Sequence, residues 1–320
     1  VLVMVTLRKN QIEPVRIGIE YFSEKKPVPS IIVAPTAFGK SIVIAAIAKG
    51  IGEKVLVIQP SKELLEQNYE KFINLGGKAT IYSASMGEKE IGDVTYATIG
   101  SIVKVATKFK ELGITKVIID ECDRFPREPN GMLRRFLKGA GIKYTLGLTA
   151  TPLKLQTNMG SDGRPFSKLV MLTSRSKKGI FFKKIIYVAQ IQEMVELGFW
   201  SKLEYQSYDF NTGDLIYNTT GAEYSNSSIK KAYKNQKISS KIVKKVEELY
   251  NRRSILIAVP SIDEAKELTT LIPNCKAVFA EKDPFIGSLK HIRIVTQNAI
   301  PAGTEITVKY VINKLENPNW

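Results

Sequence analysis

The 320-residue sequence predicts an α/β fold of parallel sheets flanked by helices, and three observations support this prediction. Short β-branched runs alternate with longer runs of helical period along most of the chain. Several apolar runs end at a polar or glycine-containing loop that opens the next helix, as in a strand–loop–helix unit. Hydrophobic residues make up 44% of the chain, enough for a sizeable core. The length favours about two domains.

The first half of the chain predicts a regular alternation of elements. A helix is expected to follow the segment LRKNQ, residues 7–11, and to continue through residues 21–22. Strands are predicted at residues 30–33, 55–60, 79–82, 94–98, 116–120 and 144–152. Helices are predicted at residues 40–49, 62–73 and 100–109, with Ser61 as the N-cap of the second. Such alternation is typical of a parallel sheet covered by helices on both faces.

The second half is less regular. After Pro152 the residues 156–184 are rich in Gly, Ser and Lys. An amphipathic helix is expected at 188–200, a short strand at 203–210, a polar stretch at 211–228 and a basic helix at 229–250. The alternation restarts with a strand at 254–260, a helix at 261–272, and strands at 276–280, 292–297 and 307–313.

The segment APTAFGKS, residues 34–41, has the pattern of a phosphate-binding loop. Gly39 allows the backbone N–H groups to curl around phosphate oxygens, and the helix that follows adds a positive dipole end. The loop residues expected around the phosphates are Pro35, Thr36, Ala37, Phe38 and Gly39. Lys40 is expected to neutralise the β- and γ-phosphates, and the Ser41 hydroxyl to bind Mg²⁺. Ala34 stands where the pattern often has glycine, and its small side chain is tolerated.

Two adjacent carboxylates follow the apolar strand at 116–120. Asp120 is expected to hold Mg²⁺ opposite Ser41, and Glu121 to polarise the attacking water as the catalytic base. The alternative is a solvated acidic turn after a strand. The preceding phosphate loop and the later segment LTATP, residues 148–152, favour the catalytic interpretation.

The charge of the chain favours a polyanionic partner. Lys and Arg outnumber Asp and Glu by 47 to 31, which gives a net charge of +16 and a pI near 9.6. Nucleic acid or an anionic membrane surface would fit, as would a basic protein without such a partner. Cys122, Cys275 and His291 predict neither a disulfide framework nor a metal cluster, so a reducing, cytoplasmic compartment is expected. No apolar run reaches membrane-spanning length, and no membrane partner is expected.

In their order along the chain, these motifs resemble those of the superfamily 2 DExD/H-box helicases. LRKNQ is similar to the adenine-reading motif, APTAFGKS to motif I, DECD to motif II and TAT, residues 149–151, to motif III. The segments similar to motif Ia, a later strand-contacting motif, motif IV and motif V are residues 60–67, 98–101, 254–268 and 292–306. The forms LRxxQ, LTATP and ELGFWSKLEY look most like the DNA-repair and phage branch of the family. If the protein is viral, the expected location is the cytoplasm of the host cell.

The resemblance implies two RecA-like domains with parallel sheets and with ATP and Mg²⁺ bound in the cleft between them. It places the first domain at 1–174, a linker or accessory segment at 175–235 and the second domain at 236–320. Residues implied to contact ATP outside the phosphate loop are Arg8, Gln11, Gly303 and Glu305. Thr149 and Thr151 would couple the ATP site to nucleic acid. Residues implied to grip one strand are Pro60, Ser61, Lys62, Thr98, Gly100, Ser101 and Thr296.

The sequence departs from the family pattern in its second half. Residues 281–291 replace a longer strand–loop–helix passage, so the second domain is expected to be short or incomplete. Motif VI, Q-x-x-G-R-x-x-R, is not found before Trp320. Because an arginine finger is worth on the order of 10³ to 10⁵ in rate, slow hydrolysis is expected unless a second subunit supplies it.

Four functions remain open from the sequence. The main prediction is an ATP-dependent DNA helicase or translocase acting on single-stranded or branched DNA. The alternatives are a restriction or repair motor that translocates without unwinding, an RNA helicase, and a non-catalytic nucleic-acid-binding protein with a switch-like nucleotide site. Basic segments at 175–184 and 229–245 could add DNA contacts, with Phe181, Phe182 and Tyr233 stacking on bases. Solvated lysine faces are the alternative there.

Overall fold

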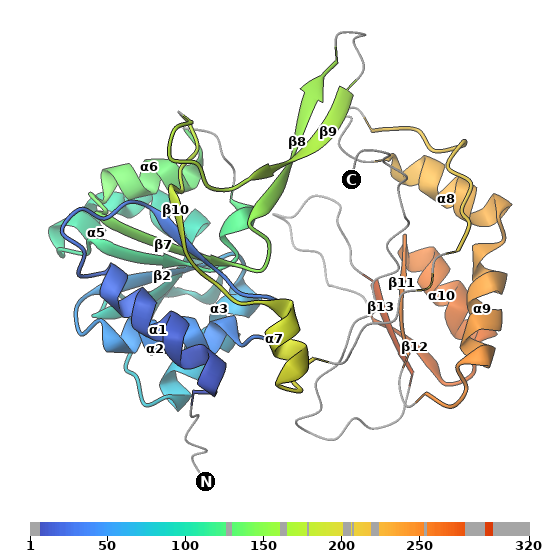
Figure 1. Cartoon of the computed structure of the whole chain (residues 1–320), viewed down its shortest axis with the longest axis horizontal. Coiled ribbons are helices and arrows are strands. Elements are labelled where there is room, and N and C mark those ends of the chain that lie inside the picture. Colours follow the sequence, from blue (N-terminus) through green and yellow to red (C-terminus); the bar gives the residue numbers. More distant parts are fainter. Residues whose placement is uncertain are drawn as a thin grey trace. The chain divides into compact units, whose positions relative to one another are not determined.

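The computed structural model describes residues 7–125, 130–160, 165–177, 179–200, 206, 208–218, 224–252, 255–278 and 292–296. The chain divides into two compact units (Figure 1). Unit 1 comprises Val1–Leu155 and Leu169–Trp200, and unit 2 comprises Gln156–Lys168 and Ser201–Trp320. In the described part of the chain, no helix has the length and apolar character needed to cross a bilayer.

Unit 1 is built on an eight-stranded sheet with the order β10-β1-β7-β6-β2-β5-β3-β4. Its strands are β1 (Ser30–Val33), β2 (Val55–Gln59), β3 (Thr80–Ser83), β4 (Glu88–Lys89), β5 (Val94–Thr98), β6 (Lys116–Ile119), β7 (Tyr144–Thr149) and β10 (Lys184–Val188). The strands pair in parallel except β4, which is antiparallel to β3. The predicted α/β class with a mainly parallel sheet is therefore confirmed.

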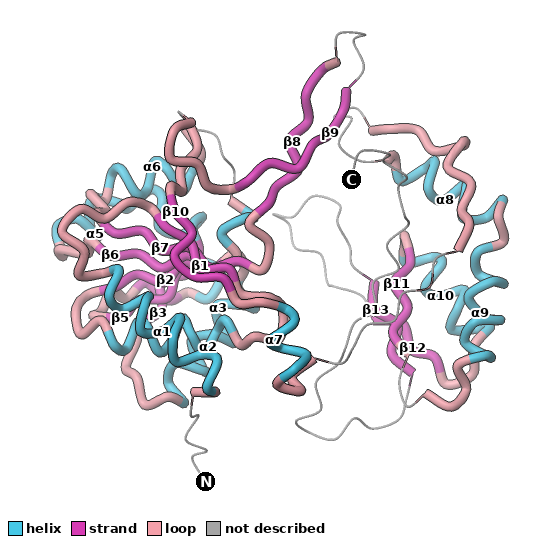
Figure 2. The backbone as a smooth tube through the Cα atoms, viewed as in Figure 1, coloured by secondary structure: helices cyan, strands magenta, loops and turns pink. Residues whose placement is uncertain are grey.

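Helices cover both faces of this sheet (Figures 1 and 2). The helices are α1 (Lys9–Tyr21), α2 (Lys40–Gly50), α3 (Lys62–Asn74), α4 (Ile99–Ile102), α5 (Ala106–Glu111), α6 (Met132–Gly139) and α7 (Ile191–Glu196). Successive strand residues point to opposite faces. In β1, Ile32 packs in the cluster of α1, α2 and α3, whereas Ile31 packs in the cluster of α5 and α6. Burial on both faces explains why the strands are continuous apolar runs.

The edge strand β10 was not predicted from the sequence. It pairs in parallel with β1, and the Ala189 N–H continues the pairing by donating to the Val33 carbonyl at 2.9 Å. The helix expected at 188–200 is shortened to α7, because Gly198 adopts a φ of 73° and ends the helical turn. Residues 169–200 thus group with unit 1. The domain boundary at 174 and the accessory segment 175–235 stay predictions.

The stretch after Pro152 also contains regular structure where none was expected. Strands β8 (Leu153–Met159) and β9 (Pro165–Met171) form a two-stranded sheet. The Leu172 N–H donates to the Pro152 carbonyl at 2.7 Å and closes the base of this ribbon. The Gly, Ser and Lys content of the segment concealed this pairing, which depends on cross-strand contacts rather than on local composition.

Unit 2 contains helices α8 (Asn226–Asn235), α9 (Ile238–Glu248) and α10 (Ile262–Leu271), with strands β11 (Leu256–Val259), β12 (Cys275–Val278) and β13 (Ile292–Thr296). The basic helix expected at 229–250 is two helices, broken at Lys237, whose φ is 52°. The sheet order is β11-β13-β12, and β13 is antiparallel to both neighbours. The prediction of a parallel sheet in this half is therefore wrong for the described strands. The pattern of apolar runs located the strands but does not encode their direction.

Other expected strands of the second half gain no support. In the run 203–210, the described residues 206 and 208–210 are not strand. The strand expected at 307–313 lies outside the described residues. The core of unit 2 is small, formed by Ile257, Val259, Ala265, Leu268 and Ile272.

Candidate functional site

The loop between β1 and α2 is held from both sides by the sheet. The Ala34 N–H donates to the Thr149 carbonyl of β7 at 2.9 Å, which extends the β1–β7 pairing into the loop. Ala37 and Gly39 then adopt left-handed conformations with φ values of 66° and 88°. A non-glycine residue in this region is uncommon and strained, and such strain clusters at functional sites. The side chain of Phe38 is fully buried, so it anchors the loop in the core.

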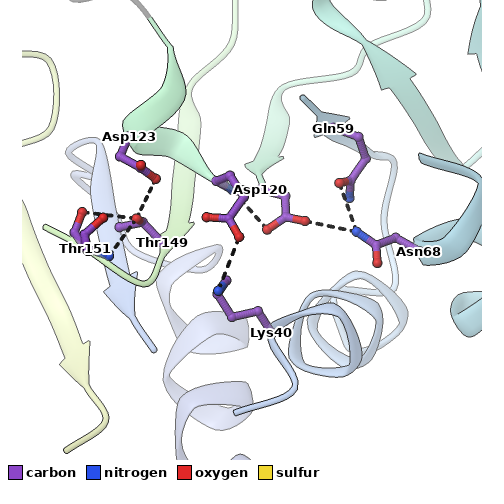
Figure 3. Close-up of polar contacts among 8 residues, drawn as sticks. Lys40, Gln59, Asn68, Asp120, Asp123, Thr149 and Thr151 are labelled. Carbon is purple, nitrogen blue, oxygen red and sulfur yellow. Dashed lines mark hydrogen bonds and ion pairs between the residues drawn. The ribbon is translucent and has the colours of Figure 1, made fainter. Parts of the chain in front are cut away.

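Lys40 and Glu121 meet across the carboxyl end of the sheet. Lys40 is the first residue of α2, and its Nζ lies 3.3 Å from Glu121 Oε1. Glu121 follows β6 in a left-handed conformation, with φ 44° and ψ 52°. Ser41 is the next residue in the first turn of α2. The lysine and the carboxylates after β6, predicted from separate motifs, are thus brought together (Figure 3).

Asp120 is the buried carboxylate of the site. Its Oδ2 accepts a hydrogen bond from Asn68 Nδ2 at 2.9 Å, and its Oδ1 accepts one from the Glu121 N–H at 3.0 Å (Figure 3). Burial raises the pKa of the Asp120 carboxyl to about 6, and the neighbouring Glu121 charge acts in the same direction. A desolvated carboxylate next to a second negative charge favours a cation beside it.

The donor set fits Mg²⁺ better than a transition metal. Among the described residues, no group of three or more His, Cys, Asp or Glu side chains could hold a metal ion. Mg²⁺ is commonly held by one or two protein oxygens with substrate phosphates and water completing its shell. Asp120 and Ser41 are oxygen donors placed beside the phosphate loop, so the residues present fit an ATP-bound Mg²⁺.

A second relay joins the DECD segment to β7. Thr149 Oγ1 donates to Asp123 Oδ1 at 2.6 Å (Figure 3). Thr149 Oγ1 also accepts a hydrogen bond from the Thr151 N–H at 3.0 Å. Thr151 takes part through its backbone, because the other contact to Thr149 is made by its carbonyl at 3.1 Å. Asp123 was not assigned a role from the sequence. Two features of the sequence could have indicated a role for Asp123: it belongs to the DECD segment, and the later strand β7 ends in a buried threonine, Thr149.

The predicted adenine-reading residues contact the phosphate loop itself. Gln11 Nε2 donates to the Phe38 carbonyl at 2.8 Å, and Gln11 Oε1 accepts from the Arg8 N–H at 3.0 Å. A Cβ atom on Gly39 would lie 2.4 Å from Gln11 Nε2, so glycine also allows this close approach. The Arg8 guanidinium lies 4.5 Å from the ring centroid of Phe199.

Trp200 extends this arrangement from the end of unit 1. Its indole Nε1–H donates to the Thr36 carbonyl in the phosphate loop at 3.0 Å. Sequence reasoning missed both Phe199 and Trp200. The aromatic pair FW belongs to the segment ELGFWSKLEY, which resembles the helicase family, and this could have drawn attention to both residues. The residue that Trp200 contacts, Thr36, lies more than 160 residues away in the chain.

Six of the seven residues expected to contact nucleic acid, all but Thr296, lie at the carboxyl ends of β2 and β5, which are adjacent in the sheet. Ser61 caps α3, as predicted, by accepting from the Leu64 N–H at 3.3 Å. Thr98 Oγ1 and Ser101 Oγ lie 2.9 Å apart, and Gly100 lies between them in the chain. Pro60 and Lys62 flank Ser61 at the surface. For Thr296 only the strand position is described, and Gly303 and Glu305 lie outside the described residues.

Two of the three aromatic residues suggested for base stacking are buried. Phe182 packs in the core of unit 1, and Tyr233 is buried in unit 2. Phe181 is half-buried, between the ring of Phe182 and the guanidinium of Arg134, which lies 4.6 Å from its centroid. The base-stacking interpretation is therefore wrong for Phe182 and Tyr233. The lysines next to them in the sequence suggested an exposed surface, but both rings are buried.

Comparison with known proteins agrees with the class that the motifs indicate. Residues 4–154 match the family model described as the type III restriction enzyme, res subunit, which is a family of superfamily 2 helicases. This segment, which is just under half of the chain, is therefore similar to the helicase-type domain of restriction-enzyme res subunits. No curated protein sequence matches the chain.

The solved structures that are similar to this chain include a restriction-modification enzyme, a helicase and an ATPase core, and the chain spans from about a sixth to three-fifths of their length. A type ISP restriction-modification enzyme bound to DNA, LlaBIII, is 18% identical with a TM-score of 0.45, covering 61% of this chain and 16% of that chain. The UvsW helicase from bacteriophage T4 is 17% identical with a TM-score of 0.40, covering 57% and 60%. The Sulfolobus solfataricus SWI2/SNF2 ATPase core with duplex DNA is 19% identical with a TM-score of 0.39, covering 47% and 33%. Sequence identities below 20% and TM-scores below 0.5 indicate nothing about the activity of this chain. The comparisons support neither a DNA-repair role nor a viral origin.

Proposed function

We propose that this chain is the motor part of a nucleic-acid-dependent ATPase that moves along or unwinds DNA. One observation above all supports the proposal: Lys40, Glu121 and Asp120 converge on a strained phosphate loop, as ATP hydrolysis requires. The superfamily 2 match of residues 4–154 and the net charge of +16 agree with a nucleic-acid partner.

ATP would be held by residues from three elements of unit 1. The loop backbone and Lys40 would bind the phosphates, and Arg8 and Gln11 would face the base. Ser41 and Asp120 would hold Mg²⁺, which supplies charge neutralisation at the phosphates. The proposed role of Glu121 is to accept the proton of the attacking water. For this it must exchange its present partner, Lys40 Nζ at 3.3 Å, for that water.

Coupling to nucleic acid is proposed to use the relay from Asp123 to Thr149 and the loops after β2 and β5. Backbone contacts would make binding independent of sequence and sensitive to salt. The logarithm of the affinity for single strands should then fall with the logarithm of salt by about 0.7 per neutralised phosphate. Salt-independent binding, or a strong preference for one sequence, would indicate base readout and count against a motor.

The test is the steady-state ATPase rate of the chain with no ligand and with single-stranded, duplex and forked DNA and RNA. Stimulation by nucleic acid supports the proposal, and Lys40→Ala is the matched inactive control. A rate that no nucleic acid changes would favour a nucleotide switch. The match to a restriction res subunit favours one second candidate, translocation without strand separation. A strand-displacement assay beside a translocation assay distinguishes the two.

A further inference from the structure

Two buried amide side chains lie beside Asp120, and the catalytic scheme above gives them no role. Gln59 and Asn68 are 0% and 1% exposed. Asn68 Nδ2 donates both to Gln59 Oε1 and to Asp120 Oδ2, each at 2.9 Å (Figure 3). Burying polar groups costs free energy unless their hydrogen bonds are remade. Two amides in this position therefore need an explanation other than stability.

The hydrogen bonding of the pair is incomplete on the side away from Asp120. Gln59 Nε2 and Asn68 Oδ1 have no hydrogen-bond partner among the described residues. An apolar pair of the same shape would avoid this cost. The hydrogen bonds that are made all lead toward one carboxylate oxygen. The arrangement therefore serves the orientation of Asp120 rather than the packing of α3.

The same pair is linked directly to the loop proposed to contact nucleic acid. Gln59 is the last residue of β2 and precedes Pro60, Ser61 and Lys62. Asn68 lies on α3, whose N-cap is Ser61. The backbone of β2 also reaches the site, because the Asp120 N–H donates to the Ile58 carbonyl at 3.0 Å. A shift of the loop at 60–62 would thus move both amides relative to Asp120.

We infer that Asn68, held by Gln59, is a positioning residue for Asp120, and that this pair transmits nucleic-acid binding at loop 60–62 to the metal-binding carboxylate. The inference rests on the proposed function. It is separate from the relay at Thr149, which acts on Asp123 and shares no residue with the amide pair. Side chains that orient a metal ligand typically change metal affinity by about 10- to 100-fold when they are removed.

Binding measurements with Mn²⁺ test the inference without relying on turnover. Electron paramagnetic resonance would follow free Mn²⁺ in the presence of a non-hydrolysable ATP analogue, with and without a thymidine oligonucleotide. In the parent chain the oligonucleotide should tighten Mn²⁺ binding, and by linkage Mn²⁺ should tighten oligonucleotide binding by the same factor. Asn68→Leu should weaken Mn²⁺ binding by about tenfold and remove most of this linkage.

Two further variants separate positioning from folding. Gln59→Met leaves Asn68 in place and should weaken Mn²⁺ binding in the same direction by a smaller factor. The double variant should be no worse than Asn68→Leu alone, because both act through one contact. Asn74→Leu, at an exposed position on α3, is the matched control. Asn68→Leu also leaves Gln59 Oε1 and Asp120 Oδ2 without this donor, so some loss of melting temperature is expected in either case. A purely structural role predicts that loss with parent-like Mn²⁺ affinity and linkage, whereas a positioning role predicts weaker Mn²⁺ binding and lost linkage at temperatures where the variant is fully folded.

The outcomes are distinguishable from those that test the proposed function. If the parent is stimulated by DNA and Asn68→Leu retains its Mn²⁺ affinity and linkage, the inference is overturned alone. If Gln59→Met and Asn68→Leu act additively, transmission through the pair is overturned. A parent whose ATPase rate no nucleic acid changes overturns the proposed function, whereas the linkage between Mn²⁺ and oligonucleotide binding, measured with the non-hydrolysable analogue, still decides this inference.

Discussion

Lys40 Nζ and Glu121 Oε1 lie 3.3 Å apart, so the phosphate-loop cation and the proposed catalytic base satisfy each other's charge. The two side chains come from α2 and from the turn after β6, more than 80 residues apart in the chain. Both remain partly exposed, at 12% and 26%. The ion pair is therefore accessible to a nucleotide that would compete for the lysine.

Replacing Lys40 with alanine is expected to abolish ATP turnover without unfolding unit 1. The lysine is proposed to neutralise phosphate, and loss of one such stabilising group typically costs about 10² to 10³ in kcat. Because the pair with Glu121 is partly exposed, its loss should cost about 1 kcal/mol of stability or less. The measurements are steady-state ATPase rate and thermal unfolding. Lys49→Ala, at the exposed end of α2, is the control, and parent-like turnover in Lys40→Ala would refute the role of the loop.

Replacing Glu121 with glutamine is expected to stop hydrolysis while ATP binding is largely retained. Glutamine keeps the shape of the side chain but cannot accept the water proton, a role worth about 10² to 10⁴ in rate. Asp120 still holds its two hydrogen bonds in this variant. Equilibrium binding of a fluorescent ATP analogue and single-turnover hydrolysis separate the two effects. Loss of nucleotide binding would contradict this division of roles.

Replacing Thr149 with valine is expected to uncouple nucleic-acid binding from hydrolysis. Valine fills nearly the same volume but cannot donate to Asp123 Oδ1, now 2.6 Å from the hydroxyl. Basal ATPase activity should persist, and stimulation by DNA should fall by about tenfold, equivalent to about 1.4 kcal/mol of coupling. Thr151→Val is the control, because Thr151 joins the relay through its backbone. Equal loss in both variants would argue against the hydroxyl relay.

Replacing Asp120 with asparagine is expected to stabilise the metal-free protein at neutral pH. The pKa of the buried carboxyl is raised from 3.8 to about 6, so the folded state holds the proton more tightly than the unfolded state. Its contribution to stability is largest below pH 3.8 and is lost as pH rises to about 6. The loss at pH 7 is about 3 kcal/mol.

The measurement is urea unfolding in EDTA from pH 4 to pH 7. The difference in unfolding free energy between Asp120→Asn and the parent should grow with pH and level off above about pH 6. Asp93→Asn, an exposed position in the same unit, provides the comparison. A difference that does not vary with pH would show that the carboxyl is not destabilised by burial.

Trp200 is expected to report nucleotide binding by its fluorescence. Its indole donates to the Thr36 carbonyl, so a phosphate bound in the loop should change its environment. The chain has two tryptophans, Trp200 and Trp320. The emission change on adding ADP should persist in Trp320→Phe and vanish in Trp200→Phe. The reverse pattern would show that the loop does not reach Trp200 when it binds nucleotide.

The sequence predicted the parts of the site that are local in the chain. The loop at 34–41, the carboxylates after β6 and the strand β7 are contiguous patterns, and each lies where the sequence located it, while their roles stay predictions. Gln59 and Asn68 were missed because their partners are distant. Two signals were nevertheless present. Asn68 falls between Leu65 and Phe72 on the buried stripe of α3, and Gln59 ends a fully buried apolar strand.

The fold of the second unit was less predictable for a physical reason. The run at 292–297 has strand character, but an isolated strand carries no information on its direction. In the structure β13 lies between β11 and β12 and runs against both. Likewise, the sequence of β10 has polar neighbours and no clear strand pattern. Its strand conformation depends on pairing with β1, at the edge of the sheet.

The position of β1 between β7 and β10 has a consequence for biosynthesis. The strand that leads into the phosphate loop is made first, and its two neighbours are made about 110 and 150 residues later. At ribosomal rates of about 5 to 20 residues per second, that interval lasts about 8 to 30 seconds. A nascent chain that ends before residue 189 cannot form the hydrogen bonds that hold β1 and the loop after it from both sides. The proposed nucleotide binding would thus be delayed until the chain has been synthesised beyond residue 189.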